Sequence, residues 1–333
     1  MKFGTGLSLQ HPLGVDLWEQ LTGGVERAKR AEAMGFDFIG TGQHYVAQPY
    51  QMLQPFPVLA FLAPQVKMRL VATIIVPLQN PVDLAEQIAT LDVLSRGRIT
   101  LDAALGYRDE EYHAFGIPRR VRAQRMEETL KLLPELWTKD QVTFHGSQFH
   151  LDRSPTGLKP VQRPHPPIWV AATSDPAIQR AGRLGLPWAV APAEAMSNII
   201  RHLPMYEKAL KEAGHPKPKE FIMIRGFCVR ERRAEAWELA EKYLGAKFAT
   251  YSRWGQDRAV TDEKPFAGQS FQELASEHFI IGDPDDCMRG LERLVALGAT
   301  HTHLYTQWPG VPVEQEDETL RVFGAKIQPA FKG

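Results

Sequence analysis

The chain has 333 residues, 44% of them hydrophobic, and its 39 lysines and arginines balance 39 aspartates and glutamates. This apolar content excludes general disorder, and the balanced charge argues against a large nucleic-acid or acidic-membrane surface. The two cysteines, Cys228 and Cys287, lie far apart, which suits neither a disulfide framework nor a zinc site, and the first residues lack the apolar run of a signal peptide. We expect a soluble cytoplasmic protein with no metal, no membrane segment and no nucleic-acid partner.

A repeated unit organises the chain: a helix that ends in a glycine, followed by a short apolar run. It occurs around Gly35, Gly97, Gly185 and Gly298. Glycine takes the left-handed conformation that ends many helices, and a buried strand then follows. The pattern is typical of stacked strand–helix units rather than of a sandwich or a helical bundle.

Eight candidate strands follow one another, each with helical sequence after it. They cover residues 3–9, 37–41, 70–75, 99–103, 168–172, 188–191, 221–229 and 302–306. Eight such units predict an α/β fold of the (β/α)8 type, a TIM barrel. A doubly wound sheet is the rival, but no Gly-x-Gly-x-x-Gly follows the first strand.

Helix starts and one helix break are also predicted. Asp16 with Glu19 forms a capping box, and Asn80 and Asp283 each stand as a cap before a proline. Pro134 lies inside an apolar helical stripe, where it should kink or break the helix.

Two stretches depart from the repeat, residues 139–167 and 250–277. The first is rich in Pro, Gly and His, with a candidate hairpin over 142–151. The second is polar but carries Tyr251, Trp254 and Phe266, with Gly255 and Gly268 as flexible points, which predicts a mobile lid. A surface loop without a role is the alternative. We expect one domain over 1–333 with these two insertions.

Candidate chemical residues stand at the strand ends, because the active site of a barrel lies at the carboxyl ends of its strands. His44 follows the second strand beside Tyr45, where a general base or hydrogen-bond donor belongs, with an ordinary loop histidine as the alternative. Thr173, Ser174 and Asp175 join the fifth strand to a helix. Their hydroxyls and free N–H groups suit a phosphate, or they simply cap the helix.

Other clusters carry weaker signals. The charged run after the fourth strand, residues 108–112, is commonly a solvated surface, although Arg108 or one carboxylate could point inward. His301 and His303 share a strand face without an acid or cysteine nearby to complete a metal site. No nucleophile elbow and no Walker loop occurs. A barrel of this kind commonly relies on an organic cofactor.

Several motifs in order resemble the luciferase-like flavin oxidoreductases, which include bacterial luciferase, alkanesulfonate monooxygenase and deazaflavin-dependent reductases. The motifs cover nearly the whole chain: residues 31–39 with Gln43-His44-Tyr45, then 81–105, 106–116, 166–172 and 280–284. The resemblance implies a (β/α)8 barrel that holds FMN, or the deazaflavin F420, over the carboxyl ends of its strands.

The resemblance also implies roles for single residues. His44 matches the active-site histidine beside the flavin ring, and Thr73 and Ile74 match a strand end where a backbone bulge, often with a non-proline cis peptide, supports the ring. Thr173 and Ser174 match the stretch that binds the cofactor phosphate. Three more cofactor-binding residues are implied by the motif after the fourth strand: Gly106, Arg108 and Tyr112.

Three departures from the family pattern stand out. Gln43 occupies a position where glutamate is common, so the anionic partner of His44 is expected to be missing. Asp102 and Ala104 replace glycines of the fourth strand. Leu105 lies where many members have an arginine that steadies the flavin phosphate, so Arg108 or another residue is expected to substitute.

The implied activity is that of a two-component monooxygenase. A separate flavin reductase supplies reduced FMN, and oxygen and a small organic substrate then react at the flavin. The mobile lid at 250–277 is expected to order over flavin and substrate. The alternatives are an F420-dependent reductase or dehydrogenase that transfers hydride, and a non-catalytic flavin-binding member. The family also implies a homodimer, and aromatic residues near the site favour an apolar or aromatic substrate: Tyr50, Phe56, Phe248, Tyr251 and Trp254.

Overall fold

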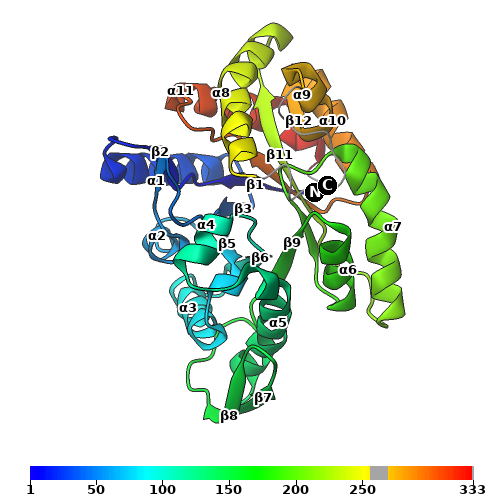
Figure 1. The fold of residues 1–333 in the computed structure, drawn as a ribbon. Coiled ribbons are helices and arrows are strands. Elements are labelled where there is room, and N and C mark those ends of the chain that lie inside the picture. Colours follow the sequence, from blue (N-terminus) through cyan, green and yellow to red (C-terminus); the bar gives the residue numbers. More distant parts are fainter. Residues whose placement is uncertain (256–268, 332–333) are drawn as a thin grey trace.

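The structure, a computed structural model, describes residues 1–255 and 269–331. Eight parallel strands form a closed ring in it: β1 (Lys2–Gly6), β3 (Phe38–Thr41), β5 (Arg69–Ile75), β6 (Ile99–Ala104), β9 (Ile168–Ala172), β10 (Trp188–Val190), β11 (Ile222–Val229) and β13 (His301–Tyr305). Strand β1 pairs with β3 and β13, and β10 pairs with β9 and β11, so the ring has no open edge (Figure 1). The predicted (β/α)8 barrel and all eight of its strands are confirmed.

Helices surround the ring (Figure 1). They are α1 (Leu17–Ala33), α2 (Pro55–Leu62), α3 (Pro81–Leu94), α4 (Asp109–Ala114), α5 (Arg122–Thr138), α6 (Asp175–Arg183), α7 (Met196–Glu212), α8 (Arg233–Arg253), α9 (Phe271–His278), α10 (Pro284–Ala296) and α11 (Val313–Lys326), with short 3-10 turns η1 (Val76–Leu78), η2 (Arg119–Val121) and η3 (Gln328–Phe331). Asp16, Asn80 and Asp283 cap their helices as predicted. Pro134 does not break α5, which continues to Thr138.

The barrel interior is narrow because small residues alternate with large ones. A lower layer of Phe38, Val71, Trp169, Ala189 and Ile222 is buried inside the ring. Gly4 makes room for this layer, since a Cβ atom there would lie 2.1 Å from the ring of Phe38. Every second strand residue points outward instead and packs against the helices in the main core.

A ninth strand, β12 (Phe279–Gly282), was not predicted as a strand. It runs parallel to β11 and pairs with its second half, Gly226 to Val229, whereas Ile222 and Met223 pair with β10. Three helices, α8, α9 and α10, pack around β12 (Figure 1).

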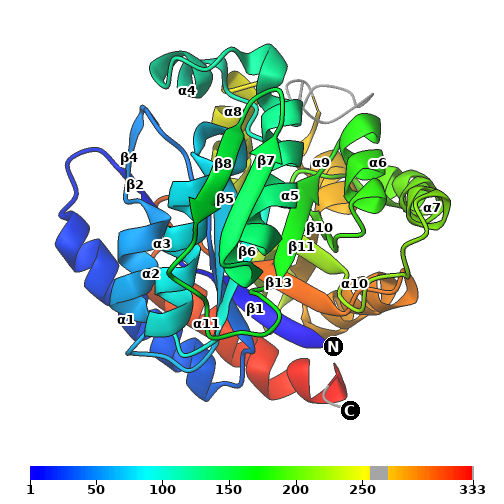
Figure 2. The same cartoon turned by 90° about the horizontal axis from the view of Figure 1, so that it is seen from below.

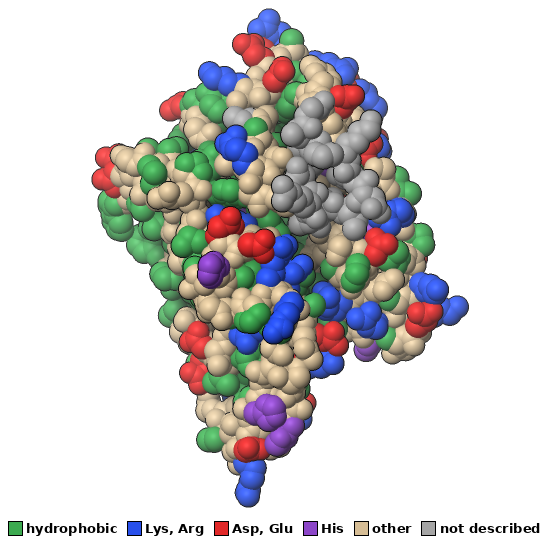
Figure 3. Space-filling model, in the orientation of Figure 1, with side chains coloured by type: hydrophobic (Ala, Val, Ile, Leu, Met, Phe, Trp, Pro, Cys, Tyr) green, Lys and Arg blue, Asp and Glu red, His purple; other side chains and the backbone are tan. Residues whose placement is uncertain are grey.

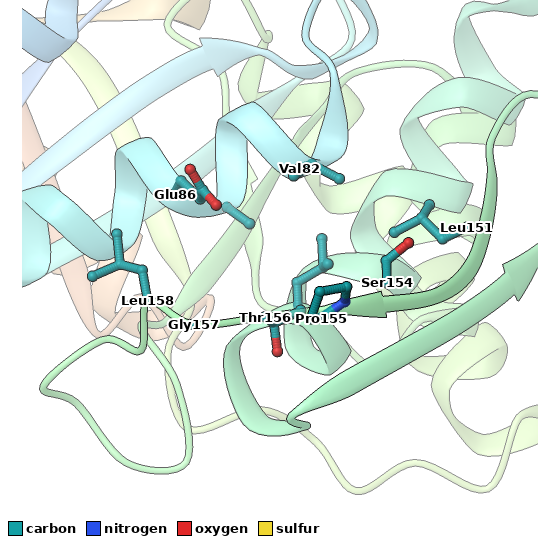
Figure 4. A pocket seen from close by; sticks show the side chains of 10 residues that line it. Val82, Glu86, Leu151, Ser154, Pro155, Thr156, Gly157 and Leu158 are labelled. Atoms are coloured by element: carbon teal, nitrogen blue, oxygen red, sulfur yellow. The ribbon is translucent and has the colours of Figure 1, made fainter.

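The insertion at 139–167 contains the predicted hairpin, formed by β7 (Gln141–His145) and β8 (His150–Pro155). It is fastened to α5, because the Glu128 carboxylate accepts the N–H groups of Ser147, Gln148 and Phe149 at 2.9–3.1 Å. A cavity of about 40 Å³ lies beneath it, next to Glu86 of α3, and is too small for an organic cofactor (Figure 4).

The insertion at 250–277 is more helical at both ends than predicted. Helix α8 extends to Arg253 and α9 begins at Phe271. Residues 256–268 of the predicted lid, which include Phe266 and Gly268, lie outside the described residues. A further antiparallel pair, β2 (Gln10–Pro12) with β4 (Tyr50–Met52), forms part of the rim. None of the described helices is long and apolar enough to cross a membrane.

Candidate active site

The carboxyl ends of the barrel strands point to the top of Figure 2, where α4 and the end of α8 lie. His44 follows β3, and its Nδ1 lies 2.8 Å from Oε1 of Glu111, in α4. The same oxygen accepts the N–H of Tyr45 at 3.0 Å. The Glu111 side chain is completely buried, while His44 is 13% exposed. Because an ionised carboxylate only accepts hydrogen bonds, Nδ1 carries the hydrogen and Nε2 is left to exchange a proton with a ligand.

Glu111 corrects the expectation that His44 lacks an anionic partner. The acidic partner, Glu111, lies in α4, which follows the fourth barrel strand, and not at position 43. Gln43 has a different role: its Oε1 accepts the N–H of Ile75 at 2.9 Å, and its Nε2 donates to the Tyr45 hydroxyl at 2.9 Å. Gln43 therefore links the ends of β3 and β5.

Arg108 points inward, but it binds the chain rather than an open site. Its guanidinium donates to the carbonyls of Tyr45 and Val46 at 2.8 and 3.2 Å and lies 3.6 Å from the Glu111 carboxylate. It also lies 4.3 Å from the ring centroid of Trp254. These contacts give Arg108 the role of fixing the loop after β3 beside His44.

Aromatic side chains from three segments surround His44: β4, the loop after β6 and the end of α8. We call Tyr50, Tyr107, Tyr251 and Trp254 the aromatic enclosure. The His44 ring lies 5.6 Å from Tyr107, 6.0 Å from Tyr251 and 5.4 Å from Trp254, and Trp254 lies 6.0 Å from Tyr50. Tyr251 donates to Gln10 and Trp254 to the carbonyl of Gln48. Burial and the neighbouring phenols raise the pKa of Tyr251, so it stays protonated.

The Tyr107 hydroxyl is the unsatisfied donor of this site. It is buried and has no hydrogen-bond partner in the described part of the chain. Burial, with the charge of Glu111 nearby, raises the pKa of Tyr107, so the phenol keeps its proton at ordinary pH. A buried donor without an acceptor next to a histidine is typical of a place that a ligand completes.

Gly106 and Tyr112 stabilise the turn after β6, at this end of the barrel. Tyr112 is buried against Ile75 and Leu78, and its hydroxyl donates to the carbonyl of Leu105. Gly106 has a φ of 76°, and a Cβ atom there would lie 2.7 Å from Ile75. The tight turn therefore requires glycine, and Tyr112 stabilises it.

The end of β5 differs from the family expectation. Thr73 donates to the Asp102 carboxylate at 2.8 Å, whereas Ile74 is fully buried in the outer core. Residues 70–75 pair with β6 in unbroken register, and the cis peptides among the described residues are Gln48–Pro49 and Arg163–Pro164. The expected bulge and non-proline cis peptide at Thr73 and Ile74 are therefore absent. Burial, partly offset by Thr73, raises the pKa of Asp102 to about 6.

Thr173 and Ser174 lie at the start of α6. Ser174 is the N-cap residue, but its side chain makes no capping hydrogen bond, so the simple capping interpretation does not hold for it. The next residue, Asp175, accepts from Arg201 at 3.0 Å and lies 2.9 Å from Nε2 of His202. Its negative charge is thus balanced where an anion would approach the helix.

A second carboxylate, Glu194, contacts the other ring nitrogen of His202. Nδ1 of His202 lies 3.2 Å from Glu194, in the segment after β10, and both side chains are completely buried. Burial raises the pKa of Glu194. Burial alone would lower the pKa of His202, but hydrogen bonds to Glu194 and Asp175 raise it overall. His202 therefore holds α6 and the end of β10 together.

An arginine cluster, Arg119, Arg122, Arg125 and Arg180, lies close to α6 and was not predicted as a site. Burial, reinforced by Arg119, lowers the pKa of Arg122, and burial with Arg183 and Arg122 nearby lowers that of Arg180. Basic side chains gather near the middle of the face that Figure 3 shows. Crowded, partly desolvated guanidinium groups favour a phosphate, and the run Arg119-Arg120-Val121-Arg122 was the available signal.

Metal chemistry finds no support in these residues: in the described ranges, no three His, Cys, Asp or Glu side chains are grouped as metal ligands. The two cysteines are buried and unbridged.

Comparison with known proteins agrees with the barrel fold. The oxygenase component of the flavin-dependent trigonelline monooxygenase of Acinetobacter baylyi is 24% identical over 92% of this chain and 89% of its own. The FMN complex of the oxygenating constituent of 3,6-diketocamphane monooxygenase from Pseudomonas putida superposes with a TM-score of 0.80, at 19% identity over 99% of both chains. An F420-dependent secondary alcohol dehydrogenase superposes with a TM-score of 0.81, at 21% identity over 100% of this chain and 99% of its own. The family model for luciferase-like monooxygenases matches residues 1–301, and the chain therefore belongs to that family.

Proposed function

We propose that this protein is the oxygenase component of a two-component, FMN-dependent monooxygenase that acts on a small apolar or aromatic molecule. The observation that carries the proposal is the His44–Glu111 pair, set in the aromatic enclosure at the carboxyl ends of the strands. The similarity to the trigonelline oxygenase component, which covers most of both chains, supports the same class.

The residues present suit a flavin phosphate at one place and a flat ring at another. Ser174 has an uncommitted side chain as the N-cap of α6, and the arginine cluster supplies positive charge close by. At Gly42, just before His44, a Cβ atom would meet nothing within 4 Å, and the Tyr107 hydroxyl lacks an acceptor. We therefore assign the phosphate to Thr173, Ser174 and Arg122, and the ring to the region beside His44.

The chain's own residues then have distinct tasks. Reduced FMN, when bound, supplies the electrons that activate oxygen. Glu111 keeps the hydrogen on Nδ1 of His44, so Nε2 holds or moves the proton. Tyr107 donates a hydrogen bond to an oxygen atom of the bound molecules, and the enclosure excludes water.

Partners follow from the same proposal. A flavin reductase delivers the reduced cofactor; the trigonelline relative is likewise named as the oxygenase component of its monooxygenase. We also expect a homodimer, because large apolar side chains are exposed along α1, α2 and α3, among them Trp18 (63%), Phe61 (38%) and Leu94 (50%). Figure 3 shows many hydrophobic side chains, in green, at the edge of the molecule near α1 and α2. The cytoplasmic location stays a prediction.

Titration of the purified protein with oxidised FMN, reduced FMN and F420 tests the assignment. We expect reduced FMN to bind and oxygen to be consumed when a reductase and NADH are added. Arg122→Gln should weaken FMN binding roughly tenfold, because a charged hydrogen bond to the phosphate is lost. Arg120→Gln, an exposed neighbour in the same run, is the matched control. Binding of F420 alone would replace the monooxygenase by a hydride-transferring enzyme, and binding of none of the three would reject a flavin function.

A further inference from the structure

A second cavity, of about 520 Å³, lies over β12 and between α8 and α10, and it shares no residue with the aromatic enclosure. Buried apolar side chains of β12, Phe279, Ile280 and Ile281, form its floor. Arg233 and Arg289, 63% and 65% exposed, stand at its rim. Its volume falls within the range of about 300–1,000 Å³ that is typical of small-molecule sites.

The extra strand explains why a hollow exists here. Helices α8 and α10 both pack on β12, and the hollow opens between them. One face of α10 lines it, since Arg289 and Arg293 are four residues apart, and Arg233 and Trp237 have the same spacing on α8. Gly290 lets α10 approach closely, because a Cβ atom there would lie 2.8 Å from Ile280.

Positive charge exceeds negative charge around the cavity. Four arginines line it, Arg225, Arg233, Arg289 and Arg293, against the carboxylates of Asp286 and Glu277. Asp286 already pairs with Arg233 at 3.4 Å and Arg289 at 2.6 Å. Glu277 accepts the N–H of Ser197 at 2.9 Å. An anion is therefore the complement that this rim lacks.

The ring of Trp237 also lines the cavity. Its indole Nε1 is buried within the protein and does not face the cavity, so a ligand would contact the ring and not the N–H group. The ring adds apolar surface beside the arginines, as an organic ligand requires.

We propose that this cavity binds a small organic anion, with its apolar body against β12 and the Trp237 ring and its carboxylate facing the arginines. The apolar floor favours an organic anion over inorganic phosphate, which would leave Phe279 and Ile281 uncovered. The site is separate from the proposed flavin chemistry and does not depend on it.

Benzoate is the probe that matches this description, and the indole N–H signals of ¹⁵N-labelled protein are the readout. The sequence has seven tryptophans, and Trp237→Phe identifies the signal of Trp237. We expect benzoate to shift that signal in a saturable way, and benzyl alcohol, which lacks the charge, to bind at least roughly tenfold more weakly.

Two variants localise the binding. Arg293→Gln should weaken benzoate roughly tenfold, whereas Arg321→Gln, on α11 and paired with Glu318, should leave it unchanged. The Arg293 result stands even if Trp237→Phe fails to fold. An unshifted Trp237 signal, an equal response to inorganic phosphate and benzoate, or unaltered affinity in Arg293→Gln would each overturn the proposal. Shifts confined to the Trp254 signal would place benzoate in the aromatic enclosure and would also overturn it.

Discussion

The two ends of the barrel use the same kinds of residue in different ways. At the lower end, Glu220 accepts from Arg69 at 2.8 Å through one oxygen and from the Trp169 indole at 2.6 Å through the other. At the upper end, Oε1 of Glu111 accepts from His44 and Tyr45, but its Oε2 has no partner in the described chain. Each end thus has a glutamate, an arginine and an aromatic neighbour.

The two ends differ in which carboxylate oxygens lack a hydrogen-bond partner. Both oxygens of Glu220 are satisfied, and burial lowers the pKa of the neighbouring His301 to about 4, which keeps that ring neutral. The upper end leaves Glu111 Oε2 and the Tyr107 hydroxyl unsatisfied. Nε2 of His301 also lacks a hydrogen-bond partner among the described residues, so the contrast is between the two glutamates: both oxygens of Glu220 are occupied, whereas Oε2 of Glu111 is left to accept from a ligand. Under the proposed function, Glu220 therefore serves stability and Glu111 serves chemistry.

The largest expected effect separates these two roles directly. His44→Ala should lower turnover roughly 100- to 10,000-fold, because the proton-transferring group is lost, and shift the melting temperature by only a few degrees. Trp169→Phe should do the opposite, costing about 1.5–3 kcal/mol of unfolding free energy through the lost bond to Glu220, with turnover retained. Reductase-coupled oxygen consumption and thermal denaturation measure both. An active His44→Ala enzyme would contradict the assignment of roles.

Asp102 lies between the two ends and gives a pH-dependent prediction. Its pKa is about 6 in the folded chain against 3.8 normally, so above pH 6 folding must bury a charge. The penalty is absent at low pH, grows as pH rises past about 4 and is complete above about 6, reaching about 3 kcal/mol. Asp102→Asn should therefore stabilise the protein by up to about 3 kcal/mol near pH 8, and the gain should vanish toward pH 4. Destabilisation at both pH values would mean that a partner keeps the carboxylate ionised.

The phosphate assignment predicts a medium effect confined to binding. Thr173→Ala and Ser174→Ala should each weaken FMN affinity by about 1.5–3 kcal/mol, roughly ten- to a hundredfold, since each removes a hydrogen bond to a charged group. Fluorescence titration measures this, and Ser197→Ala, on α7, is the control. Parental affinity in both variants would move the phosphate elsewhere.

The smallest effect compares two tyrosines after the turn at Gly106: Tyr107, which follows it directly, and Tyr112, in α4. Tyr112→Phe removes a bond to the Leu105 carbonyl and should cost about 1 kcal/mol of stability. Tyr107→Phe removes a hydroxyl without a partner, so stability should be unchanged or slightly higher, while turnover falls. Denaturant unfolding of both variants decides the matter. An equal loss of stability in Tyr107→Phe would show that its hydroxyl is already bonded.

The sequence predicts the ring well because each strand is followed by its own helix and glycine signal. His44 and Ser174 could be placed at the functional end for the same reason, since strand order alone puts them there. Glu111 could not be identified as the partner of His44, because the two are 67 residues apart and β5 lies between their strands. The pairing of β5 with both β3 and β6 brings them together.

Strand β12 and the arginine cluster were not predicted from the sequence, for different physical reasons. Strand β12 has four residues, too few for a period of two to be recognised, and its pairing depends on the length of β11. The arginine cluster resembles an exposed helix start, and its burial arises from the packing of α5 beside α6. The family bulge at Thr73 and Ile74 was wrong because β5 keeps regular pairing with β6.

Closure of the ring through β1 and β13 has a consequence for synthesis. Lys2 pairs with His301, so the first strand made must wait for nearly the whole chain before it finds its neighbour on that side. At about 5–20 residues per second, this wait lasts roughly 15–60 s on the ribosome. During that time one edge of β1 can offer its N–H and C=O groups to other nascent chains. That edge of β1 has no partner strand in the barrel until β13 is made.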